Sequence, residues 1–121
     1  MRIVHFELPV DEIERAVKFY TEAFGWKIHK WDGPMPYWLV ETGPNEEPGI
    51  NGGFFLRSEH NSALKNTLSV PSVDESTAKI TALGGTIVMP KMAVPGVGHM
   101  AYCKDTEGNL FGIIEHDKTA Q

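Results

Sequence analysis

Apolar residues along the chain divide it into two halves with the same order of elements. In the first half, a β-rich run at residues 3–8 precedes Pro9, and a helical pattern follows. This pattern consists of Ile13, Ala16, Val17, Tyr20 and Phe24. Asp11 with Glu14 is typical of a capped helix start, and Gly25 of a helix end. Strands are then predicted at 26–31, 37–42 and 54–57, so the order is β-α-β-β-β.

The second half repeats this order after a polar stretch. A strand is predicted at 67–70, followed by Pro71 and by a helix with Asp74 as its N-cap. Thr77, Ile80 and Leu83 recur at helical spacing along one side of this helix, and Gly84-Gly85 ends it. The last three strands are predicted at 86–89 or a little beyond, 99–104 and 110–114. Each half therefore predicts one βαβββ module.

Three short segments align between the halves: LPVDE with VPSVDE, FGW with LGGT, and PGINGGFF with EGNLFGII. Setting Gly49 on Gly108 places Gly53 on Gly112, in the middle of an apolar run where a bulky residue is expected. Two modules that each expose one sheet face are needed to close a core. We therefore expect a single domain over 1–121, with module one at 1–57, a connector at 58–65 and module two at 66–117.

Composition narrows the possible partners and location. The 121 residues have 41% hydrophobic content, enough for a core, and a net charge of −5, which disfavours nucleic acid and anionic membranes. No apolar run approaches the roughly 20 residues of a membrane span, and the start MRIVHFELPV lacks the features of a signal peptide. We expect a cytoplasmic protein. The single cysteine, Cys103, is expected to be a small buried residue and not a catalytic thiol.

The tandem modules resemble the vicinal oxygen chelate superfamily, which includes glyoxalase I, bleomycin-resistance proteins, fosfomycin-resistance transferases and extradiol dioxygenases. The resemblance rests on HFELPVDEIERAVKFYTEAFGW in module one and DTEGNLFGIIE in module two, and it is nearest to predicted enzymes related to lactoylglutathione lyase. It implies an α+β fold in which eight strands form a partly open barrel or cleft with the helices outside. It also implies a ligand cavity inside, and often a homodimer.

In metal-dependent members of the superfamily, one residue at the start of each module's first strand and one on each module's last strand hold the metal. Carried over to this chain, the first position falls on His5 and its counterpart on Thr67 or Leu68. The last-strand positions fall on Gly53 and Gly112, which have no side chain. Since a catalytic cation needs about three protein ligands, we expect no metal and no cofactor. The two glycines are instead expected to open room for a ligand near the backbone.

Period-2 alternation places His5 and Glu7 on one face of the first strand, opposite Phe6 and Leu8. His5, tuned by Glu7, is a candidate general acid/base or hydrogen-bond partner of a substrate. The alternative is a hydrogen-bonded histidine inherited from an ancestral metal site.

Other residues are candidates for the ligand cavity. Trp38 and Phe54 are expected to line it, together with Gly53 and Gly112, and His99 either lines it or lies at a loop edge. By the same alternation, Glu115 points toward the helix side or the rim, and His116 shares the face of Gly112.

The leading hypothesis is a glyoxalase-related protein that binds a small organic molecule in an aromatic, metal-free cavity; whether it also catalyses a reaction stays open. One alternative is a metal-dependent lyase or dioxygenase, in which Glu7, His99 or His116 join His5. Another is a sequestering protein of the bleomycin-resistance kind that captures a cationic drug. The third is an interaction module without a small ligand. Exposed sheet edges and aromatic residues favour a homodimer.

Overall fold

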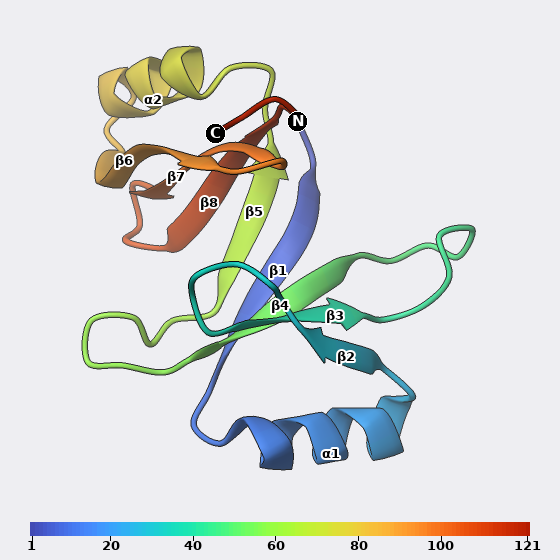
Figure 1. Cartoon of the computed structure of the whole chain (residues 1–121). Helices are drawn as coiled ribbons and strands as arrows, with labels where there is room; N and C mark the ends of the chain where they lie inside the picture. The colour runs from blue at the N-terminus through green and yellow to red at the C-terminus, as the bar shows by residue number, and fades with distance from the viewer. The chain divides into compact units, whose positions relative to one another are not determined.

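A computed structural model describes all residues from Met1 to Gln121 and contains two helices and eight strands (Figure 1). The elements of the first half are β1 (Ile3–Val10), α1 (Ile13–Phe24), β2 (Lys27–Lys30), β3 (Tyr37–Glu41) and β4 (Asn51–Leu56). Those of the second half are β5 (Lys65–Ser69), α2 (Val73–Ala82), β6 (Thr86–Val94), β7 (Gly98–Lys104) and β8 (Leu110–His116). The α+β class with two βαβββ modules is therefore confirmed. Contacts group the residues into one unit of His5–Leu64 and another of Met1–Val4 with Lys65–Gln121.

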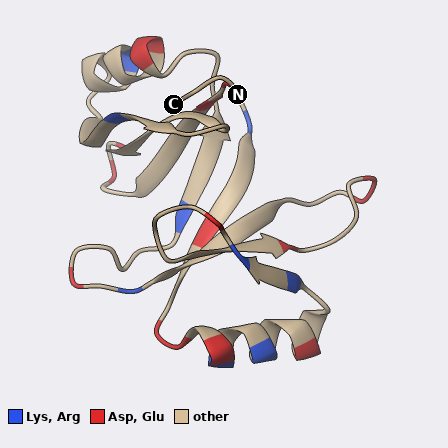
Figure 2. Ribbon diagram, in the orientation of Figure 1, with Lys and Arg blue, Asp and Glu red and all other residues tan.

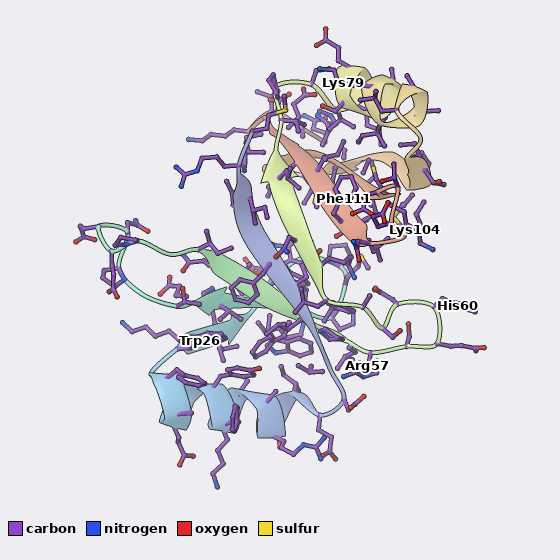
Figure 3. All side chains as sticks on the ribbon, turned by 180° about the vertical axis from the view of Figure 1, so that it is seen from behind. Trp26, Arg57, His60, Lys79, Lys104 and Phe111 are labelled. Carbon is purple, nitrogen blue, oxygen red and sulfur yellow. The ribbon has the colours of Figure 1, made fainter.

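The His5–Leu64 unit is a four-stranded sheet with α1 packed on one face. Its strand order is β2-β3-β4-β1, with β1 parallel to β4 and the other pairs antiparallel. Val10, Val40 and Phe54 form the buried centre of the core. Tyr20 of α1 stacks on Trp26 with ring centroids 4.7 Å apart, which fixes the end of the helix against the sheet (Figure 3).

The second unit repeats this arrangement with strand order β5-β8-β7-β6 and a parallel β5–β8 pair. Its core is formed by Val70, Val73, Ala101, Cys103 and Ile113. In each unit the outermost strand, β2 in the first and β6 in the second, pairs with a single neighbour.

The expected helix caps are wrong in both modules. Asp11 does not cap α1; Glu12 stands at the cap position without a side-chain bond, and the Asp11 carboxylate accepts a 3.0 Å hydrogen bond from Arg57 Nε instead. In α2, the Ser72 hydroxyl accepts from the Glu75 N–H at 3.1 Å, and Asp74 lies inside the first turn. Asp11 therefore bonds to Arg57, which is distant in sequence, and not to the N–H groups of α1 that the local pattern predicted. Gly25 ends α1 with φ of 73°, as expected.

Several strands are longer than the sequence predicts. β1 continues through Pro9 to Val10, and β4 begins at Asn51 rather than at residue 54. β6 runs to Val94 through Pro90, with register shifts against β7 on either side of Met89. Proline interrupts a strand where its missing N–H would have to bond to a neighbouring strand. On an edge strand such as β6, one side pairs with no strand, so Pro90 is tolerated there. Neither helix, the longer of which has 12 residues, is long and apolar enough to cross a membrane.

Candidate functional site

The polar face of β1 is the first candidate site. Phe6, Leu8 and Val10 pack into the core under α1. His5 and Glu7 alternate with them and point to the opposite face of the sheet, as the sequence predicts. Glu7 is only 6% exposed. A carboxylate is rarely buried to this extent without a structural or functional reason, which makes this face chemically distinct from the rest of the unit.

His5 is held by Tyr37, a residue that the sequence analysis did not select. The His5 Nε2 atom and the Tyr37 hydroxyl are 2.7 Å apart, a hydrogen bond between β1 and β3. Burial lowers the pKa of the His5 imidazole below its ordinary value, and the charge of Glu7 acts in the opposite direction. Trp31 meets the Tyr37 ring edge-on at a centroid distance of 6.1 Å. The site therefore pairs an imidazole whose neutral form is favoured by burial with the phenol of Tyr37. The Tyr37 ring is in turn packed against Trp31.

Gly53 lies beside this pair and explains how Tyr37 reaches His5. It is the partner of Glu7 in the parallel β1–β4 register. The hydroxyl and ring of Tyr37 occupy the space that a Cβ atom at position 53 would need. The expectation that Gly53 opens room for a ligand is therefore wrong, because an aromatic side chain of the same unit fills that room. Any side chain at this position would displace Tyr37.

The second unit carries the counterpart of this face on β5. Gly112 is paired with Thr67, just as Gly53 is paired with Glu7. Thr67 is therefore the counterpart of Glu7, and Lys65, two residues earlier, is the counterpart of His5. This corrects the expectation that Thr67 or Leu68 corresponds to His5. The error arose because a match of short motifs does not fix strand register, whereas the parallel pairing does.

Trp38 and Phe54 lie on the helix side of the sheet and not beside His5. The two residues are paired across β3 and β4, and both pack against the core under α1. The expectation that they share a cavity with His5 is wrong, because the pairing of β3 with β4 places both side chains on the face that α1 covers. Tyr37 and Phe55 take the other face.

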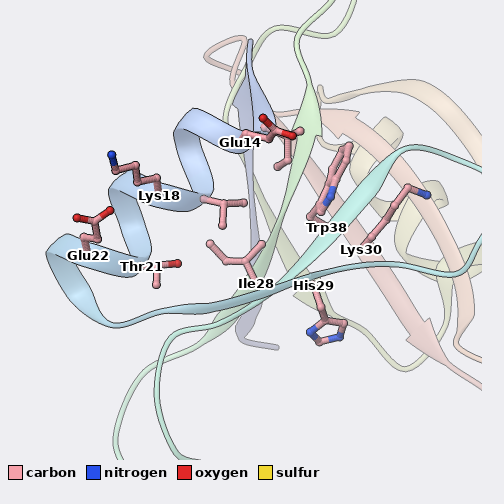
Figure 4. Close-up of a pocket in the computed structure, with 10 residues that line it drawn as sticks. Glu14, Lys18, Thr21, Glu22, Ile28, His29, Lys30 and Trp38 are labelled. Atoms are coloured by element: carbon pink, nitrogen blue, oxygen red, sulfur yellow. The ribbon is translucent and has the colours of Figure 1, made fainter.

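Trp38 instead borders an open groove of about 520 Å³ between α1 and β2 (Figure 4). Charged side chains of both signs surround the groove, among them Lys18, Glu22 and Lys30. α1 itself carries both acidic and basic residues (Figure 2). The groove therefore has no consistent charge that would select a ligand, and none of the candidate catalytic residues lines it.

The remaining candidates lie on the α2 side of the second unit or outside any site. His99 alternates with Ala101 and Cys103, which belong to the core facing α2, so it does not line the Gly112 face as proposed. The Glu115 carboxylate accepts a 2.9 Å hydrogen bond from the Val73 N–H, which confirms its predicted direction toward the helix. Cys103 is buried, and burial raises the pKa of its thiol, as expected of an unreactive cysteine.

A family model for the N-terminal part of bleomycin-resistance-like proteins matches residues 2–43. Relatives are similar over nearly the whole chain. One is a glyoxylase-like domain-containing protein of Didymella fabae, 29% identical over 93% of this chain and 91% of its own length. Another is a lactoylglutathione lyase of Salmonella typhimurium, 26% identical over 95% of this chain and 93% of its own length. These similarities support the resemblance to the vicinal oxygen chelate superfamily that the sequence analysis described.

Solved structures of similar fold match nearly the full chain. A methylmalonyl-CoA epimerase of Streptomyces coelicolor aligns with a TM-score of 0.72, over 100% of this chain and 98% of its own, at 14% identity. A hypothetical protein of Bacillus halodurans aligns with a TM-score of 0.72 over 99% and 97%, at 16% identity. At these identities the likeness concerns the fold alone.

The residues at the superfamily's metal positions do not fit a divalent cation. With the register corrected, these positions hold His5, Gly53, Lys65 and Gly112. Only the imidazole is an ordinary metal ligand, and the ammonium of lysine repels a cation. No three His, Cys, Asp or Glu side chains gather closely enough to hold a metal. The side chains at and beside these positions offer imidazole, phenol, carboxyl and amine groups.

Proposed function

We propose that this protein binds a small organic molecule without a catalytic divalent cation, through the polar face formed by His5, Glu7 and Tyr37. The observation that carries the proposal is the 2.7 Å hydrogen bond between His5 Nε2 and the Tyr37 hydroxyl. It replaces the metal–ligand bond that the superfamily makes from the position of His5. The absence of a side chain at Gly53 supports the proposal, because Tyr37 takes that space.

The pair is suited to contact a polar group of a ligand and to move a proton. Because burial lowers the pKa of His5, the imidazole is mainly neutral near pH 7 and can accept a proton from a bound molecule. Tyr37 can donate its hydroxyl proton to a ligand oxygen while His5 accepts from another atom. We propose a proton transfer next to a carbonyl group as the chemistry that these groups serve if the protein is an enzyme.

A second candidate function is a metal-dependent lyase, favoured by the similarity to the Salmonella lactoylglutathione lyase over 95% of this chain. It requires a ligand set that the register does not supply. Metal analysis of protein purified without chelators separates the two. Nickel, zinc, manganese and iron are each expected to leave the melting temperature of the purified protein unchanged. Stoichiometric metal bound through His5 would contradict the proposal.

The ligand itself is accessible to experiment. Native mass spectrometry of the purified protein, followed by thermal-shift screening that includes lactoylglutathione and methylmalonyl-CoA, identifies small molecules that bind. Variants His5→Gln and Tyr37→Phe are expected to weaken binding about tenfold or more, since each removes one hydrogen-bonding group. His29→Gln, on the neighbouring strand β2, is the matched control and is expected to bind normally. Equal binding by all three variants would overturn the proposal.

We further propose that the protein acts as a homodimer in the cytoplasm. Large apolar side chains that remain exposed in the single chain, such as Phe19, Phe24 and Leu83, support self-association.

A further inference from the structure

Trp31 lies directly after β2, on the same face of the sheet as Tyr37. The register of β2 with β3 pairs Lys30 with Trp38. One step further along, the Trp31 N–H donates a 2.8 Å hydrogen bond to the Tyr37 carbonyl. Residues opposite each other on an antiparallel pair share a face of the sheet, and successive residues take opposite faces. Because Trp38 packs into the core under α1, Trp31 and Tyr37 lie on the other face, with His5.

A glycine provides the space for each of these two aromatic rings. The Trp31 indole occupies the space that a Cβ atom at Gly33 would need, so the indole lies over the Gly33 backbone. Gly53 provides the space for the Tyr37 ring in the same manner. The indole meets the Tyr37 ring edge-on, with 80° between the two ring planes, an arrangement that aromatic pairs favour. The indole is therefore in contact both with the Gly33 backbone and with the Tyr37 ring.

The loop that connects Trp31 to Tyr37 is restricted in conformation. It consists of residues 32–36, with the sequence DGPMP. Proline fixes its own φ angle and disfavours the helical region for the residue before it, so Pro34 and Pro36 together restrict most of the loop. A chain that has few conformations to lose is held in one of them at a lower entropic cost. The loop therefore favours one placement of the indole without a bound ligand.

The hydrogen bond between Tyr37 and His5 requires one orientation of the Tyr37 ring. The imidazole and the phenol ring are nearly parallel, with 20° between their planes, and the 2.7 Å hydrogen bond joins them at Nε2 and the hydroxyl. A change of the Tyr37 χ1 rotamer would move the hydroxyl out of hydrogen-bonding range and expose the imidazole to water. Trp31 is the cross-strand neighbour that packs against this ring.

We propose that Trp31 is a positioning residue, whose indole, placed over Gly33, keeps the Tyr37 hydroxyl on His5 Nε2. The inference deepens the proposed function and rests on it, because His5 and Tyr37 are the groups proposed to contact a ligand. Trp31 acts through Tyr37 and is not itself a catalytic residue. The alternative is that Trp31 only stabilises the end of the β2–β3 pair. In that case its replacement lowers stability and leaves the imidazole of His5 unchanged.

NMR of the full-length protein without added ligand separates the two roles. The ¹⁵N chemical shift of His5 Nε2 and the pKa of the imidazole are measured in Trp31→Leu, with Tyr37→Phe as the reference that lacks the hydroxyl. In Trp31→Leu, the Nε2 shift is expected to move toward that of Tyr37→Phe. The His5 pKa is expected to rise toward the ordinary value of about 6.5, because the imidazole loses part of the burial that lowers its pKa while the charge of Glu7 stays in place.

Three further variants complete the comparison. Trp31→Phe keeps an aromatic edge and is expected to retain most of the unmodified Nε2 shift. Phe19→Leu removes an exposed ring of α1, on the other side of the sheet, and is the control that is expected to leave His5 unchanged. Gly33→Ala displaces the tip of the indole, and alanine can adopt the backbone conformation of this residue. It is expected to move the Nε2 shift in the same direction as Trp31→Leu, with little change in melting temperature.

Gly33→Ala decides the question if Trp31→Leu does not fold. Unchanged His5 signals in both variants, or in Gly33→Ala alone if only that variant folds, would overturn the positioning role and leave the proposed function intact. So would a change in Trp31→Leu no larger than that in Phe19→Leu. The proposed function fails on a different result, normal ligand binding by His5→Gln and Tyr37→Phe, which the NMR comparison does not use.

Discussion

His5 is the residue whose chemistry depends most on its neighbours. Burial lowers its pKa and the charge of Glu7 raises it, with burial the larger effect. Replacing Glu7 with Gln removes the raising charge, so we expect the His5 pKa in Glu7→Gln to fall below that of the unmodified protein. The measurement is an NMR titration of the His5 ring protons. Glu46→Gln, in the exposed loop before β4, is the control, and a His5 pKa that stays constant or rises in Glu7→Gln would contradict the argument.

The lowered pKa also predicts a pH dependence of stability. Below the ordinary histidine pKa of about 6.5, the unfolded chain takes up a proton at position 5 that the folded protein resists. The stability that neutral His5 provides is therefore complete above this pH and declines as the pH falls toward the folded-state value. His5→Asn is expected to show a smaller loss of unfolding free energy between about pH 7.5 and about pH 5. Urea denaturation at both pH values measures the difference.

Gly53 is predicted to be intolerant of any side chain. In Gly53→Ala, the new methyl group meets the Tyr37 hydroxyl and ring, which must move and release His5. We expect a loss of about 1–3 kcal/mol in unfolding free energy, typical of overpacking. Gly43→Ala is the control, because its Cβ would lie 3.5 Å from the flexible Glu47 side chain, and it is expected to be nearly neutral.

A double variant identifies the cause of that loss. Adding Tyr37→Ala to Gly53→Ala removes the obstructing ring, so the cost of the two changes together is expected to be less than the sum of their separate costs. Strictly additive losses in denaturant unfolding would show that Gly53 is required for another reason.

The sequence predicts which face of β1 carries His5 and Glu7, but not which side chains they contact. Alternation correctly placed His5 and Glu7 opposite Phe6 and Leu8, because a single strand determines that pattern. The positions of Tyr37 and Lys65 and the directions of Trp38 and Phe54 depend on the pairing between strands. The register of β1 with β4 pairs residues 46 positions apart, such as His5 with Asn51, so no short sequence motif determines it.

The helices show how an element can be capped by a residue distant in sequence. The first N–H of α2 is satisfied by the Glu115 carboxylate of β8 at 2.9 Å, and the third by the Ser72 hydroxyl. The negative charge of Glu115 also interacts favourably with the positive, N-terminal end of the helix dipole of α2. Glu115→Ala and Ser72→Ala are each expected to lose about 1 kcal/mol of unfolding free energy. Glu107→Ala, in the turn before β8, is the control; a loss equal to that of the control would contradict the capping role of Glu115.

Element order was predictable from the sequence, whereas element ends were not. Gly25 and the repeated apolar patterns fix the helices and the βαβββ order, since glycine and periodicity act locally. β6 extended five residues beyond the predicted end because Pro90 is tolerated on an edge strand. The same strand shows how an exposed edge is protected: a proline and two register shifts disfavour the addition of another strand.

The outermost strands β2 and β6 are both poorly suited to pair with a strand of another molecule. β2, the other outermost strand, has only four residues, and Lys27 and Lys30 lie at its ends. The sequence-based expectation of a homodimer was based partly on exposed edges, and the structure removes this reason. The proposed homodimer would then use side-chain surfaces. Phe19 and Phe24 of α1, in edge-to-face contact with each other, are the exposed aromatic pair that remains.

We predict that dimer formation depends on this pair. Sedimentation equilibrium is expected to give twice the chain mass of 13.4 kDa, and Phe24→Lys to shift the molecule toward the monomer, because a charge replaces an apolar contact surface. Met35→Lys is the matched control, since Met35 is exposed to the same extent, 66% against 63%, but lies in the loop between β2 and β3. A monomer at all concentrations would contradict the homodimer. A dimer that Phe24→Lys leaves intact would place the contact on another apolar surface, such as that around Leu83 beyond α2.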